Sequence, residues 1–297
     1  MKLFFLLVFS IFSCAVSAQK TDMALQKKIE SLFKSFNGEV GIYVQNLNDK
    51  SVVAINADTI FPTASMVKVP ILIGIMHQIH DGVLQYHQSM TYTDSLFYSE
   101  GDDMLASFKS GEKIELSKVI LLMMSTSDNA ASLWLQGLTG GTKINNYLDS
   151  LGMKATRVNS RTEGRKLNYN QYGWGQTTPA EMAELLKMIV DNKIIDKTIS
   201  ERMLRVMGRQ YWDEEAISQI PPNIFIASKS GAVDASRSEV LYVNSATPYI
   251  FCICTKNNKD QSWQSDNEAW VLTRKVSQLL FEHYNPKSTW KASPLLK

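Results

Sequence analysis

Apolar residues recur at helical spacing along most of the chain, while the segments near its two ends alternate as strands do. The helical spacing predicts helices over 21–36, from about 64 towards 81, and over 116–124, 130–138, 142–151, 179–190, 199–207 and 267–284. Strands are expected at 40–46, 51–56, 224–230, 237–244 and 249–255, the first two joined as a hairpin. Two polar stretches, 92–111 and 153–176, have no clear period, and an aperiodic stretch as long as the second is usually functional.

Strands at both ends therefore enclose a mainly helical middle. The economical architecture is of the α/β (α+β) type, with one antiparallel sheet flanked by the N- and C-terminal helices and an inserted all-α part. We expect the α/β part at about 19–60 and 211–297, and the all-α part at about 61–210. A site at the junction of the two parts is expected, because pockets favour such interfaces.

The first 18 residues have the features of a secretory signal peptide. Met1 and Lys2 precede a short apolar run at 3–9, and small residues lead to an expected cut after Ala18. We expect a secreted or periplasmic mature protein. The alternative is lipidation at Cys14, to which Phe12 is a poor fit, and no other segment reaches the length of a membrane span.

Composition removes several functional classes. The chain of 297 residues is 44% hydrophobic and 20% charged, which is typical of a globular protein, and its net charge of +2 is too small to imply nucleic acid or an anionic membrane as partner. Cys252 and Cys254 point to one face of a strand, so we expect buried thiols rather than a disulfide. Four scattered histidines and no cysteine cluster argue against a structural zinc site, and the sequence implies no other metal or organic cofactor.

Ser65 and Lys68 form the first candidate catalytic pair. If a helix begins near Ala64, the two side chains share one face, and a lysine of lowered pKa can take the proton of a serine nucleophile. Ser-x-x-Lys also occurs at four other places, in the signal peptide, on an amphipathic helix and in two polar loops (Ser17, Ser31, Ser110 and Ser288). Taken alone, the pair is more typical of a helix cap followed by a surface lysine.

Two more motifs follow in order. Ser127-Asp128-Asn129 lies at a break between predicted helices, 62 residues after Ser65, and Lys229-Ser230-Gly231 ends a predicted strand 102 residues further on. Each has a second copy in less suitable surroundings, at 265–267 and 109–111. In this order and spacing the three motifs resemble those of class A β-lactamases and penicillin-binding serine enzymes. The resemblance extends from Phe61 to the strand near Arg237, and includes Gly140-Gly141 and Thr177-Thr178-Pro179.

The resemblance implies a role for each residue in opening the cyclic amide of a β-lactam. Ser65 would attack the carbonyl, Lys68 would act as base or in the proton relay, and Ser127 would protonate the departing nitrogen. The backbone N–H groups of Ser65 and Ala232 would form the oxyanion hole. Asp128 would brace its loop. The substrate-binding residues would be Asn129 for the side-chain amide and, for the carboxylate, Lys229, Ser230 and Gly231, with Arg237 as a second anchor unless it is a solvated strand arginine.

The step that is least clear from the sequence is hydrolysis of the acyl-enzyme. The resemblance implies a Glu-x-x-Leu-Asn loop whose glutamate activates water, and Glu163 lies 36 residues after Ser127, about where that glutamate belongs. Its distance to Leu167-Asn168 is one residue too long, and alignment on Leu167-Asn168 would place Gly164 or Arg165 near the position of the base. Glu163 is thus either the water-activating residue or a surface residue in a basic turn.

Three functions therefore remain open at this point. The first is a class A-like serine hydrolase that opens β-lactams through a Ser65 acyl-enzyme. The second is a penicillin-binding-type relative with poor β-lactam turnover, or one that acts on a cell-wall peptide-like substrate. The third is an inactive ligand-binding relative, against which the intact Ser65, Lys68, Ser127 and Lys229 argue.

Overall fold

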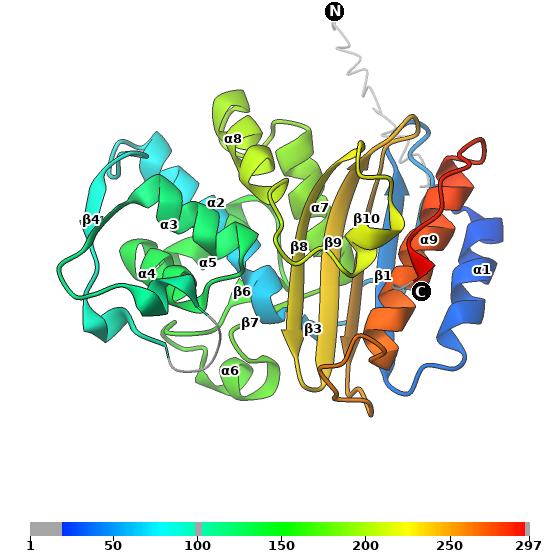
Figure 1. Cartoon of the computed structure of the whole chain (residues 1–297), viewed down its shortest axis with the longest axis horizontal. Coiled ribbons are helices and arrows are strands. Elements are labelled where there is room, and N and C mark those ends of the chain that lie inside the picture. The colour runs from blue at the N-terminus through cyan, green and yellow to red at the C-terminus, as the bar shows by residue number, and fades with distance from the viewer. Residues whose placement is uncertain (1–19, 99–102, 295–297) are drawn as a thin grey trace, which may run out of the picture.

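The computed structural model describes residues 20–98 and 103–294 (Figure 1). The predicted signal peptide and Cys14 lie outside the described residues. None of the helices in this described part is both long and apolar enough to cross a bilayer.

A five-stranded sheet forms the centre of the molecule, in the order β2-β1-β10-β9-β8. Each strand pairs antiparallel with its neighbours. The strands are β1 (Glu39–Asn46), β2 (Val52–Ile55), β8 (Phe225–Val233), β9 (Ser236–Asn244) and β10 (Tyr249–Lys256). Because β1 and β2 come from the start of the chain and the others from its end, the predicted fold class is confirmed.

The two terminal helices cover the outer face of this sheet (Figure 1). They are α1 (Met23–Phe33) and α9 (Glu268–Tyr284). Leu25 and Ile29 of α1, four residues apart, are buried in one apolar cluster with Leu272 and Val276 of α9 and with inward-facing residues of the strands. Burial of these stripes fixes the helices on the sheet and leaves its other face for the helical part.

The opposite face of the sheet is covered first by α7 (Pro179–Val190). Cys252 and Cys254 are buried on this face as free thiols, as predicted, with their sulfurs 3.7 Å apart. Thr178 caps α7 by accepting from the backbone N–H of Glu181 at 3.2 Å. The carboxylate of Glu181 accepts from the backbone N–H groups of Ala155 and Thr156. Glu181 therefore holds the start of the 153–176 stretch against the first turn of α7.

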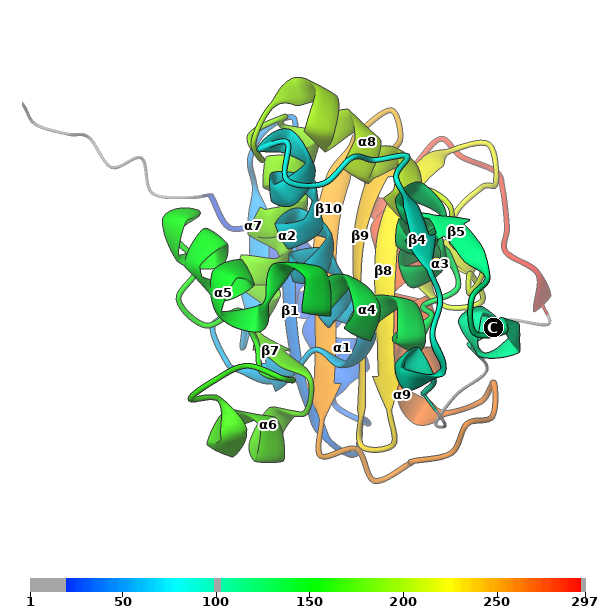
Figure 2. The same ribbon diagram turned by 90° about the vertical axis from the view of Figure 1, so that its left-hand side faces the viewer.

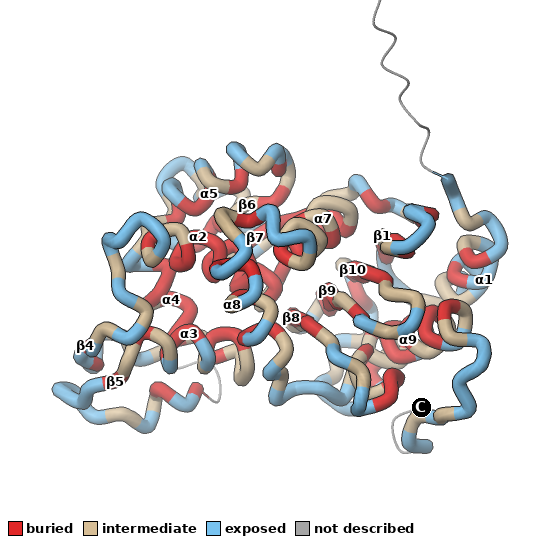
Figure 3. Tube along the Cα trace, turned by 90° about the horizontal axis from the view of Figure 1, so that it is seen from above, coloured by how far each residue is buried: buried red, intermediate tan, exposed pale blue. Residues whose placement is uncertain are grey.

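Beyond α7 and β8 lies the helical part, with α2 at its centre (Figure 2). Ten of the 13 residues of α2 (Lys68–His80) are buried, as expected for a helix that is apolar on all sides. Figure 3 shows these buried positions in α2 and in the sheet strands. The surrounding helices are α3 (Leu116–Ser125), α4 (Asn129–Thr139), α5 (Gly141–Ser150) and α8 (Lys197–Met207).

The described residues of the two aperiodic stretches form only short elements. Those of the first form two 3₁₀ turns (Asp94–Leu96 and Met104–Ser107) and connecting loop, flanked by the paired strands β4 (Ser89–Thr91) and β5 (Lys113–Glu115). The second contains β6 (Arg157–Val158), α6 (Lys166–Tyr172) and β7 (Gly175–Thr177). Strand β7 pairs with β6 and with β3 (Phe61–Pro62), so this stretch folds back against the approach to Ser65.

The boundaries proposed for the two parts stay predictions. The helix α7 lies within the stretch assigned to the all-α part, yet it packs on the sheet. Chain order therefore assigns α7 to the all-α part, whereas its packing assigns it to the part that contains the sheet.

Candidate active site

Ser65 lies where the short strand β3 turns into the central helix. Pro62 ends the strand, Ala64 takes a left-handed conformation with φ of +44°, and a 3₁₀ turn (Ala64–Val67) leads directly into α2. A left-handed alanine is strained, and such strain is characteristic of functional sites. Since the turn packs against β8, it places Ser65 between the sheet and the helices.

Lys68 is fully buried one turn after Ser65 and connects three residues of the site. Its Nζ lies 3.0 Å from Ser65 Oγ, 3.0 Å from Ser127 Oγ and 2.9 Å from Asn129 Oδ1, and it also donates to the backbone carbonyl of Ser127. Burial, followed by the positive charge of Lys229, holds the pKa of Lys68 well below its usual value. A lysine of this kind can accept the proton of Ser65.

Two buried aspartates hold the Ser127 segment. Ser127 has φ of +60° at the break between α3 and α4. Asp128 accepts from the backbone N–H of Ala131 at 2.7 Å and caps α4, which agrees with its predicted bracing role. Asp103 accepts from the backbone N–H of Asn129 at 2.7 Å. Sequence reasoning missed Asp103, because it lies in the aperiodic first stretch and no motif marks it.

Strand β8 approaches the Ser65 turn closely because Gly231 has no side chain. A Cβ at Gly231 would lie 2.4 Å from the carbonyl oxygen of Thr63 and 2.9 Å from the backbone nitrogen of Ser65. Ser238 on β9 also donates to the Thr63 carbonyl, at 3.2 Å. The Lys229-Ser230-Gly231 motif is therefore adjacent to Ser65 in space, as its proposed role requires.

Lys229 is the second fully buried lysine of the site. Its ammonium donates to the Ser230 carbonyl at 2.9 Å. Burial lowers the pKa of Lys229 to about 8, although the nearby Glu239 carboxylate acts in the opposite direction. Lys229 thus carries its charge near neutral pH and loses it in mild alkali.

Arg237 is buried, which excludes the solvated strand arginine considered from the sequence. It pairs directly with Ala232 across the β8–β9 ladder. Its guanidinium carbon lies 4.5 Å from the ring centre of Trp263 and 4.8 Å from that of Trp270. Its two terminal nitrogens donate to the backbone carbonyls of Asp234, Ser236 and Ser262. Both terminal nitrogens are thus already engaged in hydrogen bonds to the backbone.

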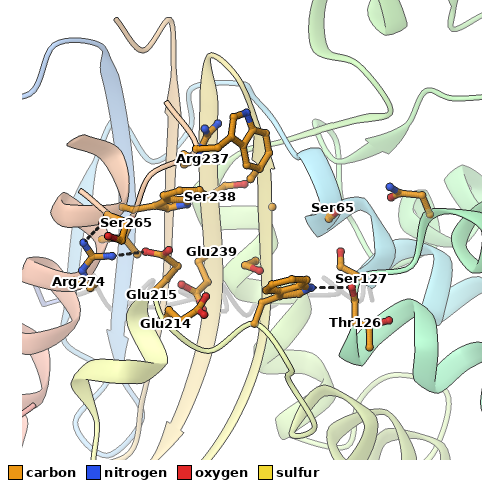
Figure 4. A pocket seen from close by; sticks show the side chains of 18 of the residues that line it. Ser65, Thr126, Ser127, Glu214, Glu215, Arg237, Ser238, Glu239, Ser265 and Arg274 are labelled. Carbon is orange, nitrogen blue, oxygen red and sulfur yellow. Dashed lines mark hydrogen bonds and ion pairs between the residues drawn. The ribbon is translucent and has the colours of Figure 1, made fainter. Parts of the chain in front are cut away.

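Two cavities meet at Ser65. The first, of about 600 Å³, runs along the strand side and is shown in Figure 4. The second, of about 800 Å³, opens towards Tyr98, Trp174 and the end of α6. Ser65, Asn129 and Ala232 line both cavities, and Ser127, Ser230, Gly231 and Arg237 line the first. The predicted nucleophile, proton donor and substrate-binding residues are therefore brought together.

The structure does not bring Glu163 to this group. Glu163 lies in an exposed turn and is not among the described residues that line either cavity at Ser65. Arg165 points inward instead, donating to Asn159 Oδ1 and Gln176 Oε1, and Asn168 shares the Gln176 oxygen. The role of Glu163 in activating water stays a prediction.

Other carboxylates line the two cavities among the described residues. Asp103, Glu214, Glu215 and Glu239 line the first cavity, and Asp234 lines the second. Glu215 and Glu239 come from segments separated by more than 20 residues and belong to no recognised motif. Sequence reasoning had no signal for them.

Comparison with known proteins identifies the family of this chain. A family model described as the β-lactamase enzyme family matches residues 24–284. The chain is 26% identical to β-lactamase VEB-1 of Pseudomonas aeruginosa over 236 residues, which cover 78% of this chain and 76% of that protein. It is 22% identical to the extended-spectrum β-lactamase PER-1 of the same organism over 289 residues, covering 93% and 92% respectively.

Solved structures agree in fold. PBP-A superimposes with a TM-score of 0.79 at 21% identity, covering 90% of this chain and 98% of that one. A class A β-lactamase from Mycobacterium abscessus gives 0.76 at 19% identity, covering 88% and 99%. Since the family model covers most of the chain, the relationship predicted from the three motifs is confirmed, and the chain belongs to the β-lactamase enzyme family.

Proposed function

We propose that this protein is a class A-like serine hydrolase that opens β-lactam rings through an acyl-enzyme on Ser65. The observation that carries the proposal is the position of Lys68 Nζ, 3.0 Å from both Ser65 Oγ and Ser127 Oγ. A buried neutral amine between two hydroxyl groups can accept the proton of the first hydroxyl. It can later supply a proton to the substrate through the second hydroxyl.

The reaction follows from this geometry. Neutral Lys68 accepts the proton of Ser65 as its oxygen attacks the lactam carbonyl, and the backbone N–H groups of Ser65 and Ala232 stabilise the oxyanion. The C–N bond then breaks, and Ser127 supplies a proton to the ring nitrogen while Lys68 replaces it. Lys229 and Ser230 attract the substrate carboxylate, and Asn129 binds the side-chain amide.

Hydrolysis of the acyl-enzyme requires an activated water, and this step separates two candidate functions. The exposed position of Glu163 favours a second candidate, a penicillin-binding-type enzyme that acylates quickly and turns over poorly. For a point mutant of the structural relative PBP-A, a solved structure is described as an acyl-enzyme complex with penicillin G. A cell-wall peptide-like amide is the alternative natural substrate for such an enzyme.

A time course of chromogenic cephalosporin hydrolysis, with intact-protein mass spectrometry during turnover, distinguishes the two candidates. Continuous turnover with little adduct supports the β-lactamase. A burst of one equivalent followed by a lasting adduct supports the penicillin-binding relative. If wild type turns over, Glu163→Gln should accumulate acyl-enzyme where Glu163 activates the water. Equal turnover by Glu163→Gln and wild type would remove Glu163 from the mechanism.

We further propose that the protein is exported and acts in the periplasm or outside the cell. The support is the charged start, the short apolar run and the small residues before position 19. N-terminal sequencing of the exported protein tests this proposal. A first residue at position 19 supports removal of a signal peptide, and a lipid-modified Cys14 would support the lipoprotein alternative.

A further inference from the structure

Ser127, the proposed proton donor, has a backbone conformation that its neighbours must maintain. Its φ of +60° lies in the left-handed region, which is unfavourable for serine and persists only where the surrounding contacts hold it. On its C-terminal side, Asp128 and Asp103 accept from the first backbone N–H groups of α4. Lys68 donates to the Ser127 carbonyl itself. These contacts leave the segment before Ser127, at the end of α3, to be held by other residues.

Three consecutive residues after α8 hold this segment, and we call them the 210–212 bridge. The backbone N–H of Tyr211 donates to the Ser125 carbonyl at 3.0 Å, and Trp212 Nε1 donates to the Thr126 carbonyl at 2.9 Å. Figure 4 draws the second bond as a dashed line beside the proposed proton donor. The last carbonyls of a helix have no partner within it, so the bridge supplies partners to the two that directly precede the proton donor.

The same bridge is attached to the sheet side of the site. Gln210 Nε2 donates to the Ser228 carbonyl at 2.8 Å, and Ser228 directly precedes Lys229 on β8. The same nitrogen donates to the carbonyl of Met207, the last residue of α8, at 2.9 Å. The 210–212 bridge therefore connects the residue before Lys229 with the two residues before Ser127, across the junction of the sheet and the helical part.

Trp212 is the member of the bridge that reaches the site. It lines the cavity of about 600 Å³ together with Ser127, and it is 45% exposed. Burial alone therefore does not account for the orientation of its indole ring. Two contacts fix that orientation, the bond to the Thr126 carbonyl and an edge contact with Tyr211, in which the ring centres lie 4.9 Å apart. The Thr126 carbonyl belongs to the peptide bond that leads into Ser127, so the indole N–H holds that peptide unit directly.

We propose that Trp212 is a positioning residue for the proton transfer by Ser127. By fixing the peptide before Ser127, its indole N–H keeps the hydroxyl within reach of both Lys68 and the departing ring nitrogen. A displacement of about 1 Å can cost about 10²-fold in rate, so a contact made through the backbone is sufficient. The competing roles for Trp212 are a purely structural end for α3 and a direct contact with substrate. This inference rests on the proposed acylation of Ser65, with Ser127 as proton donor.

The first test is acylation by a penicillin, followed by stopped flow in wild type and in Trp212→Phe. Phenylalanine keeps an aromatic ring and removes the N–H donor. The limiting acylation rate constant should fall about tenfold, which is part of the 10²- to 10⁴-fold that a positioned proton donor contributes. The penicillin concentration that gives half of the limiting rate should stay as in wild type, because the positioning role involves no contact with substrate.

A double-mutant cycle with Ser127→Ala distinguishes the three roles. Without the Ser127 hydroxyl, Trp212 has nothing to position, so adding Trp212→Phe to Ser127→Ala should cause little further loss. A structural role or a direct substrate contact would instead give the same fold loss with and without this hydroxyl. Timed mass spectrometry of the intact protein measures the slow acylation of the Ser127→Ala variants.

Trp263→Phe is the matched control. Trp263 is 57% exposed, lines the same cavity and donates its indole N–H to Asp234 Oδ1 at 2.8 Å, in the turn between β8 and β9. Whatever the size of its effect on acylation, that effect should be the same in wild type and in Ser127→Ala. Circular dichroism verifies the fold of every variant, and Trp212→Leu removes the same donor if Trp212→Phe does not fold.

The outcomes separate this inference from the proposed function. If penicillin does not acylate Ser65 in wild type, the proposed function itself fails, and this inference fails with it. If acylation occurs and Trp212→Phe leaves the limiting rate constant unchanged, the positioning role is overturned. It is also overturned if the loss is as large in Ser127→Ala as in wild type. A loss that appears only where the Ser127 hydroxyl is present supports it.

Discussion

Lys68 and Lys229 are both fully buried in one site, but their surroundings differ, and so do the chemical roles that we assign to them. Lys68 is surrounded by hydroxyl, carbonyl and amide oxygens, and its pKa lies well below the usual value, so it serves as a base. Lys229 has a pKa of about 8, with Glu239 favouring its charge, so it serves as an anion anchor. Pairs of titratable groups whose surroundings separate their pKa values are typical of acid–base sites.

Lys229→Arg tests this assignment through pH. Lys229 is charged below about pH 8 and neutral above it, so wild-type KM for a carboxylate-bearing β-lactam should rise above pH 8. Arginine keeps its charge throughout this range, so the rise should disappear in the variant. The measurement is the acylation rate constant against substrate concentration from pH 6 to 10.

Lys109→Arg, in the first polar stretch, is the matched control and should keep the wild-type profile. An alkaline rise in KM that persists in folded Lys229→Arg would assign the titration to another group.

At this scale the sequence predicts residues that lie in local motifs. Ser65 with Lys68, and Ser127 with Asn129, were identified because each pair is only two or three residues apart. The contact of Asp103 with Asn129 spans 26 residues and leaves no local pattern. The inward turn of Arg165, in place of Glu163, likewise depends on Asn159 and Gln176, which only the folded loop brings near.

At the scale of elements, the site depends on how closely β8 approaches the 3₁₀ turn before α2. Gly231 permits the approach, and the left-handed Ala64 aims Ser65 into the cavity. Helices with a buried apolar stripe were predicted to within a few residues, because burial imposes the period that the sequence shows. The short α6 (Lys166–Tyr172) was missed, since none of its residues is buried and no stripe marks it.

Gly231→Ala tests the importance of this close approach. The new methyl would lie 2.4 Å from the Thr63 carbonyl oxygen, so β8 and the Ser65 turn must separate. We expect a loss of about 1–3 kcal/mol in the free energy of unfolding, together with a large fall in the acylation rate. Denaturant unfolding and stopped-flow acylation measure the two effects.

Gly137→Ala is the matched control in α4, where a Cβ would meet no atom within 4 Å. That change should stabilise the protein by about 0.5–1 kcal/mol through helix propensity and leave acylation intact. Wild-type acylation in Gly231→Ala would show that the close approach is not needed.

At the scale of the whole molecule, the site is assembled from the middle of the chain and its C-terminal part. The helical part supplies Ser65, Lys68 and Ser127, and the sheet supplies Lys229 and Arg237. The sequence predicted a site at this junction because pockets favour the interface between two parts of a chain. It did not predict that Glu214 and Glu215, which precede β8 in the chain, would line the same cavity as Glu239 of β9.

Peptide mapping after reaction with a labelled penicillin tests directly whether Ser65 is the nucleophile. The three ordered motifs and the 3.0 Å contact of Lys68 with Ser65 predict a single adduct, located on the peptide that contains Ser65. Folded Ser65→Ala should form no adduct under the same conditions. Labelling of Ser65→Ala at the wild-type level, or a wild-type adduct on another residue, would show that Ser65 is not the nucleophile.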